Sequence, residues 1–97
     1  MPSYLVMGNY TEQGVKAIKA SPQRLDAAKQ AAQTAGGRMI FFYLTLGPYD
    51  FAALFELPDD ETAASLLLGI SRQGNVRTTT LKAFTEDEYQ RIIAAVP

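Results

Sequence analysis

Four polar side chains in separate segments of this sequence could together hold or transform a small molecule. Asp50 lies just after a Gly-Pro turn in "LTLGPYDFAALFEL", residues 44–57. A carboxylate at a strand end can act as a general base, and an arginine or a tyrosine can stabilise an oxyanion on a carbonyl or phenolic substrate. We therefore predict Asp50 as the best candidate for a catalytic residue. The predicted ligand-binding group is Tyr10, Tyr43, Asp50 and Arg77.

The composition excludes most other chemistry. The chain has no cysteine and no histidine, which rules out disulfides, thiolate nucleophiles, Ser-His-Asp triads and histidine-ligated zinc or haem. The densest acidic run, residues 59–61, lacks the glycine of a cation-binding loop and is better explained as the start of a helix. We therefore expect no metal and no cofactor.

Charge and hydropathy also exclude several partners. The net charge is −1 and the basic residues are scattered, which argues against binding nucleic acid. No apolar run approaches the length of a membrane span, and the first ten residues have no basic segment of the signal-peptide type. The expected location is cytoplasmic. With 97 residues there is room for one core, so we predict a single domain over residues 1–97.

Strand and helix signals alternate along the chain. Strands are predicted at residues 3–10, 38–46, 49–57 and 75–84, the middle two forming a hairpin around a two-residue Gly-Pro turn. This turn would pair Leu46 with Tyr49 and place Thr45 opposite Asp50. Helices are predicted at residues 11–20, at 22–35 after an N-cap Ser21, from Asp59 or Asp60 through 70, and at 89–95 after a capping box that begins at Thr85. The second of these helices has an apolar stripe, whose alanines are expected to pack closely on the sheet: Leu25, Ala28, Ala32 and Ala35.

This order predicts an α+β fold of the ferredoxin-like, split βαβ type. Two βαβ crossovers that share a hairpin give a four-stranded antiparallel sheet of strand order 4-1-3-2, with the helices on one face. In this topology the ends of the first two strands and the starts of the last two meet at one edge. We predict a pocket at this strand-end edge.

Alternation along the strands predicts which side chains point away from the helices. On the hairpin these are Met39, Phe41, Tyr43, Thr45, Asp50, Ala52, Leu54 and Glu56, and elsewhere Tyr4, Val6, Gly8, Tyr10 and Arg77. An exposed face that carries Met39, Phe41 and Leu54 is a liability for a monomer. We therefore predict a homodimer through this open sheet face. The basic helix residues Lys16, Lys19 and Arg24 are expected to be solvated.

Three stretches of the sequence resemble the GYD-domain family, over about residues 4–88. They are "YTEQGVKAIKASPQR", "FYLTLGPYDFAALFELPDDETA" and "GNVRTTTLKAF", and the Gly-Tyr-Asp signature is Gly47, Tyr49 and Asp50 with Pro48 inserted. The resemblance implies a dimeric α+β barrel type of ferredoxin-like fold. Related barrel families include cofactor-free monooxygenases, lactone isomerases and haem-handling enzymes, whose axial histidine this chain lacks. The family has no established reaction.

Three classes of function remain open at this point. The first is a homo-oligomer, a dimer or larger, that binds a small molecule at the strand-end edge without catalysis. The second is a cofactor-free, monooxygenase- or isomerase-like enzyme that uses Asp50 as its base. The third is a structural or interaction domain with no ligand. The sequence favours the first class.

Overall fold

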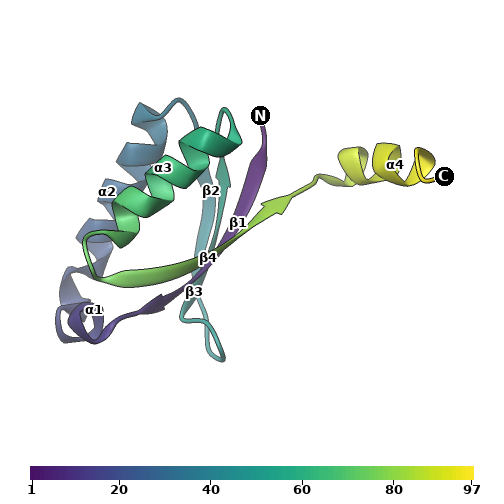
Figure 1. The fold of residues 1–97 in the computed structure, drawn as a ribbon. Helices are drawn as coiled ribbons and strands as arrows, with labels where there is room; N and C mark the ends of the chain where they lie inside the picture. Colours follow the sequence, from purple (N-terminus) through teal and green to yellow (C-terminus); the bar gives the residue numbers. More distant parts are fainter.

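The computed structural model describes residues 1–97 and has the predicted order of strands and helices. The elements are β1 (Ser3–Tyr10), α1 (Glu12–Lys16), the 3₁₀ helix η1 (Ile18–Ala20), α2 (Ser21–Thr34), β2 (Arg38–Leu44), β3 (Phe51–Glu56), α3 (Asp60–Ser71), β4 (Val76–Ala83) and α4 (Glu86–Ala94). The antiparallel sheet has the order β2-β3-β1-β4, which is the predicted 4-1-3-2 read from the other edge. Helices α2 and α3 cover one face, here called the helix face, and leave the opposite, open face bare (Figure 1).

Most helix ends use the caps that the sequence predicts. Asp59 accepts a hydrogen bond from the Thr62 amide at 2.8 Å, and Thr85 forms the predicted capping box with Glu88. Helix α2 ends in a Schellman motif, in which Gly36 adopts a φ of 91°. The prediction that Ser21 is an N-cap is wrong. Helix η1 runs directly into α2, which places Ser21 in the first helical turn.

The core lies between the helix face and helices α2 and α3. Small residues on the helices, Ala32 on α2 and Ala63 on α3, are almost fully buried and allow close approach to the sheet. The other members of the core are Tyr4, Val6, Ala53, Phe55, Leu57 and Leu67. None of the helices combines the length and the apolar composition that a membrane span needs.

The predicted facing of β1 is wrong. Tyr4 pairs with Phe55, Val6 with Ala53 and Gly8 with Phe51, and these β3 residues all point into the core. Tyr4, Val6, Gly8 and Tyr10 therefore lie on the helix face, while Leu5, Met7 and Asn9 lie on the open face. The strand is apolar on both sides, so alternation within β1 alone could not decide between the two faces.

The facing of β2 is correct near the turn and wrong at the far end. Phe41 lies opposite Leu54 and Tyr43 opposite Ala52, as predicted, but Met39 lies opposite Phe55 and packs against the core. The register shifts between Met39 and Phe41, which leaves Ile40 as a bulge residue outside the pairing. One extra residue reverses the alternation of all residues beyond it.

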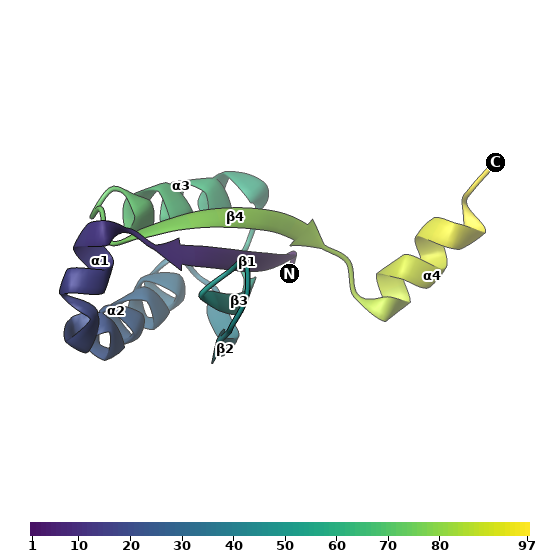
Figure 2. The same ribbon diagram turned by 90° about the horizontal axis from the view of Figure 1, so that it is seen from below.

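Helix α4 contradicts the prediction that all helices lie on one face. It stands beyond the end of β4, away from α2 and α3, in both views (Figures 1 and 2). None of its residues is buried. The side chains of Tyr89, Ile92 and Ile93 lie on one side of this helix and are exposed, as is Val96 just beyond its end. The apolar side of α4 therefore has no partner within the chain.

Candidate functional site

Asp50 ties the end of the β2–β3 hairpin to β1. Its backbone N–H donates to the Gly8 carbonyl at 2.8 Å, and its carboxylate oxygen Oδ2 accepts from the Tyr10 backbone N–H at 2.9 Å. Pairing of β3 with β1 ends at Phe51 and Gly8, whereas β1 continues to Tyr10. The Tyr10 N–H lies beyond the end of β3 and has no β3 carbonyl to pair with. The Asp50 carboxylate therefore accepts the hydrogen bond of this backbone N–H instead.

The turn before Asp50 is longer than the predicted two residues. The β2–β3 pairs end at Leu44 and Phe51, so the predicted pair of Leu46 with Tyr49 does not form and Leu46 is fully exposed. Thr45 closes the loop: its N–H donates to the Asp50 carbonyl at 2.8 Å, and its hydroxyl donates to the Tyr49 carbonyl at 2.6 Å. Thr45 thus lies opposite Asp50, as predicted.

The four predicted ligand-binding residues do not surround one pocket. Tyr10 lies on the helix face, with its ring centroid 5.6 Å from that of Phe51. Tyr43 lies on the open face, is 64% exposed and packs against Phe41. Arg77 is exposed on the open face as predicted, and neither it nor Asp50 belongs to an ion pair; the ion pairs are Lys16–Glu12, Arg38–Glu56 and Lys82–Asp60. A ligand-binding role for the four residues stays a prediction.

The strand-end edge is also a structural joint between α1 and β4. The Thr11 hydroxyl donates to the Gly74 carbonyl at 2.5 Å, and the Thr11 N–H donates to the Asn75 carbonyl at 3.0 Å. A Cβ added to Gly14 would lie 2.1 Å from the same Asn75 oxygen, so glycine is needed there for close approach. The backbone groups of this joint are paired with one another.

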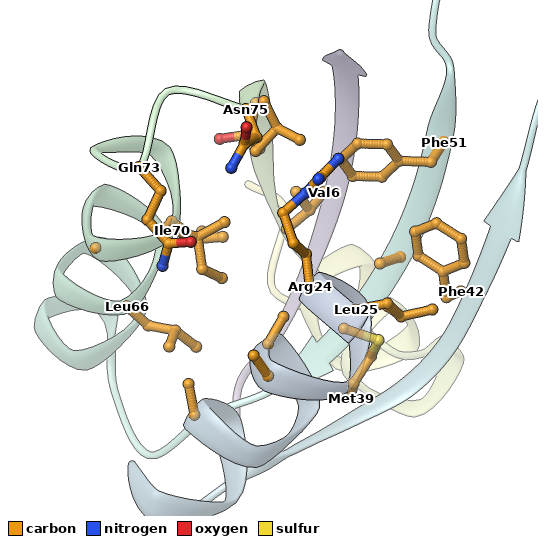
Figure 3. A pocket seen from close by; sticks show the side chains of 18 of the residues that line it. Val6, Arg24, Leu25, Met39, Phe42, Phe51, Leu66, Ile70, Gln73 and Asn75 are labelled. Atoms are coloured by element: carbon orange, nitrogen blue, oxygen red, sulfur yellow. The ribbon is translucent and has the colours of Figure 1, made fainter. Parts of the chain in front are cut away.

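A cavity of about 250 Å³ lies between α2, α3 and the helix face (Figure 3). Apolar side chains form 15 of its 22 lining residues, among them Leu25, Met39, Phe42, Phe51 and Ile70. Helix α2 contributes Ala27, Ala28 and Ala31, whose short side chains leave the space between helix and sheet unfilled. The sequence predicted alanine packing on α2 but not this cavity, because its volume depends on the separation of three elements.

Arg24 supplies the cavity's single charge. It was expected to be solvated, but Figure 3 shows its side chain extending among the lining residues toward Phe51. Nη1 donates to the Ala17 carbonyl at 3.0 Å, whereas Nη2 is shielded from solvent and has no hydrogen-bond partner. The sequence contains a signal for this position. Ala28 belongs to the apolar stripe of α2, and Arg24 lies four residues before it, on the same side of the helix.

A second polar cluster, missed by the sequence analysis, joins the start of α3 to the sheet. The buried Tyr4 hydroxyl donates to Asp60 Oδ1 at 2.5 Å, and Lys82 Nζ lies 3.0 Å from the same oxygen. Burial, reinforced by the bond to Asp60, raises the pKa of Tyr4 to about 12, and this bond is the main cause that lowers the pKa of Asp60. Nowhere do three acidic side chains gather closely enough to hold a metal ion.

Comparisons with known proteins agree with this architecture. The model of the GYD domain matches residues 4–93. A Thermus thermophilus protein named glutamine synthetase and cystathionine beta-lyase binding protein is 33% identical over 84 residues, which cover 86% of this chain and 88% of that protein. The crystal structure of TTHA0845, also from Thermus thermophilus, is similar, with a TM-score of 0.55 and 28% identity over 88% of this chain and 95% of that one. This chain belongs to the GYD domain family.

Proposed function

We propose that this chain is a protein-binding domain, with residues 1–97 acting as one unit. The observation that carries the proposal is the open sheet face, whose apolar side chains no element of the chain covers. These side chains are Leu5, Met7, Phe41, Tyr43, Leu54 and Leu81. A contiguous apolar surface of this kind marks an interaction site. The name of the Thermus thermophilus relative, which describes a protein that binds two enzymes, supports the same function.

A second copy of the chain is the occupant that we propose for the open sheet face. Sheets pack face to face at about 10 Å when both faces are apolar and flat. The centre of this face is apolar, and its charged residues Arg38, Glu56 and Arg77 belong to the ends of their strands. Two such faces can stack without burying a charge at the centre, which gives the homodimer expected from the sequence.

Helix α4 is then the surface that we propose for a different protein. Its apolar residues Tyr89, Ile92 and Ile93 have the i, i+3, i+4 spacing of helices that bind in apolar grooves, and Val96 follows just beyond the end of the helix. Residues 86–88 at its start are all acidic, and Gln90 and Arg91 add further polar side chains to the helix. By extension from the relative's name, the partners to test are glutamine synthetase and cystathionine beta-lyase.

The experiment measures binding of this chain to both enzymes, taken from its own host and immobilised for biolayer interferometry. The double variant Ile92→Asp with Ile93→Asp removes the apolar stripe and should weaken binding by about tenfold or more. The control Gln90→Glu changes an exposed residue outside the stripe and should leave the affinity unchanged. The proposal is contradicted if the wild type binds neither enzyme, or if the double variant binds as tightly as the wild type.

A second candidate function is binding of a small molecule, which the cavity beneath α2 and α3 favours. Tyr10 and Asn75 line this cavity and belong to the strand-end edge at which the sequence predicted a pocket. Engineered apolar cavities of about 150 Å³ in other proteins already admit benzene, so a volume of about 250 Å³ is sufficient for a small ligand. The enzyme hypothesis has less support, because the Asp50 carboxylate already accepts a structural hydrogen bond.

A further inference from the structure

We infer that the cavity binds a small monocarboxylate with an apolar body, whose carboxylate pairs with Arg24. The inference rests on the second candidate function and specifies the class of its ligand. It concerns the helix face of the sheet and is independent of any protein that covers the open face.

The charge of the ligand follows from the state of Arg24. Its Nη2 group is withdrawn from solvent and has no partner, although a guanidinium is costly to leave unpaired. The lining of the cavity contains no aspartate and no glutamate, so the chain itself provides no counter-ion there. A ligand with one negative charge would supply the missing acceptor. Carboxylate is the acceptor that matches one guanidinium without a second cation.

The body of the ligand follows from the remaining lining. Figure 3 shows the Arg24 guanidinium near Phe51, with Asn75 also toward the upper end of the cavity, and Leu66 and Met39 lower down. The side-chain N–H groups of Gln73 and Asn75 have no partner within the chain and can donate to a polar head, whereas Asn75 Oδ1 already accepts from Gln13 and the Tyr10 and Ser21 hydroxyls are bonded to each other. The rest of the lining is apolar, so the complementary ligand has one polar end and one apolar end.

The test compares octanoate with octan-1-ol, which has the same apolar chain without the charge, by isothermal titration calorimetry. Wild-type protein should bind octanoate at least about tenfold more tightly than octan-1-ol, because a charge-assisted hydrogen bond forms only with the carboxylate. Arg24→Gln should remove this preference, so that the two probes bind with similar affinity. Arg24→Lys should keep part of the preference. The control Arg72→Gln alters an exposed arginine at the end of α3 and should bind both probes as the wild type does.

The failures of this test are distinguishable. Absence of binding for both probes would overturn the second candidate function together with this inference. Equal affinity of the wild type for octanoate and octan-1-ol, or undiminished octanoate binding by a folded Arg24→Gln variant, would leave a binding cavity and overturn the carboxylate assignment. The comparison of the two probes on the wild type decides the question even where Arg24→Gln does not fold.

Discussion

The two faces of the sheet carry similar apolar side chains but differ completely in what covers them. On the helix face Val6 is 2% and Phe55 3% exposed, whereas on the open face Leu81 is 49% and Tyr43 64% exposed. Within one chain, α2 and α3 cover the helix face and leave only the cavity between them and the sheet unfilled. The open face has no cover within the chain, and in our proposal another molecule supplies it. On this proposal, the stability of the monomer and its assembly depend on opposite sides of one sheet.

The strongest test of this difference is a charge at the centre of the open face. Leu54→Asp should prevent dimer formation and leave the monomer folded, because the dimer would bury an unpaired carboxylate at a cost of about 3 kcal/mol or more. Size-exclusion chromatography with light scattering measures the mass. The matched control is Leu68→Asp, at an exposed leucine on α3, which should leave the mass unchanged. A wild type that is monomeric at micromolar concentration would refute the dimer.

On the helix face the largest effect should come from Gly8→Val. A Cβ at Gly8 would lie 2.1 Å from the ring of Phe51, which is buried in the core side of the sheet. Displacing this ring should lower the free energy of unfolding by about 2–3 kcal/mol, as measured by urea denaturation. As a control, Gly69→Ala on α3 adds a Cβ that meets nothing within 4 Å and should not destabilise the chain. Wild-type stability of Gly8→Val would show that Phe51 has free space to move.

Asp50 belongs to the edge between the two faces, and its variants test the structural role of its carboxylate. Asp50→Ala leaves the Tyr10 N–H without its acceptor and should cost about 1–2 kcal/mol in urea denaturation. Asp50→Asn keeps an acceptor oxygen and should cost less than about 0.5 kcal/mol. If Asp50→Asn instead destabilises the chain as much as Asp50→Ala, the negative charge itself is required.

A smaller effect at neutral pH, together with a pH dependence, should come from the Tyr4 hydroxyl on the helix face. Because burial raises the pKa of Tyr4 from 10.0 to about 12, the folded state holds this proton more tightly than the unfolded state does. The resulting stability is present below pH 10 and is lost as pH rises from 10 toward 12. Tyr4→Phe should remove this loss and cost about 1 kcal/mol at neutral pH through the missing bond to Asp60. Tyr89→Phe, at an exposed tyrosine, is the control.

Local signals were sufficient to predict the elements but not the faces of two strands. The caps at Asp59, Thr85 and Gly36 act through neighbouring backbone groups, so sequence spacing reveals them. The order of the strands followed from the connection rules. The facing of β1 depends on pairing with β3, and that of Met39 on a bulge at residue 40, neither of which leaves a local pattern.

The candidate site was predicted less well than the fold. Asp50 does lie at the strand-end edge, and Arg77 does lie on the open face. Tyr10 and Tyr43 could not be assigned to opposite faces without the pairing of β1. The cavity and the position of Arg24 depend on the distance between α2 and the sheet, which alanines at several positions determine jointly.

The anchoring of the hairpin end has a consequence for how the Gly-Tyr-Asp signature should be used. Gly47 adopts a φ of 123°, the Tyr49 carbonyl accepts from Thr45, and Asp50 fastens the loop to β1. Gly47 and Asp50 thus maintain the shape of one loop, whereas Tyr49 contributes only its backbone carbonyl to these bonds. Proteins that share the signature can therefore share this loop while recognising unrelated molecules. Transfer of a partner or ligand between relatives should depend on the residues of the open face, α4 and the cavity, compared position by position.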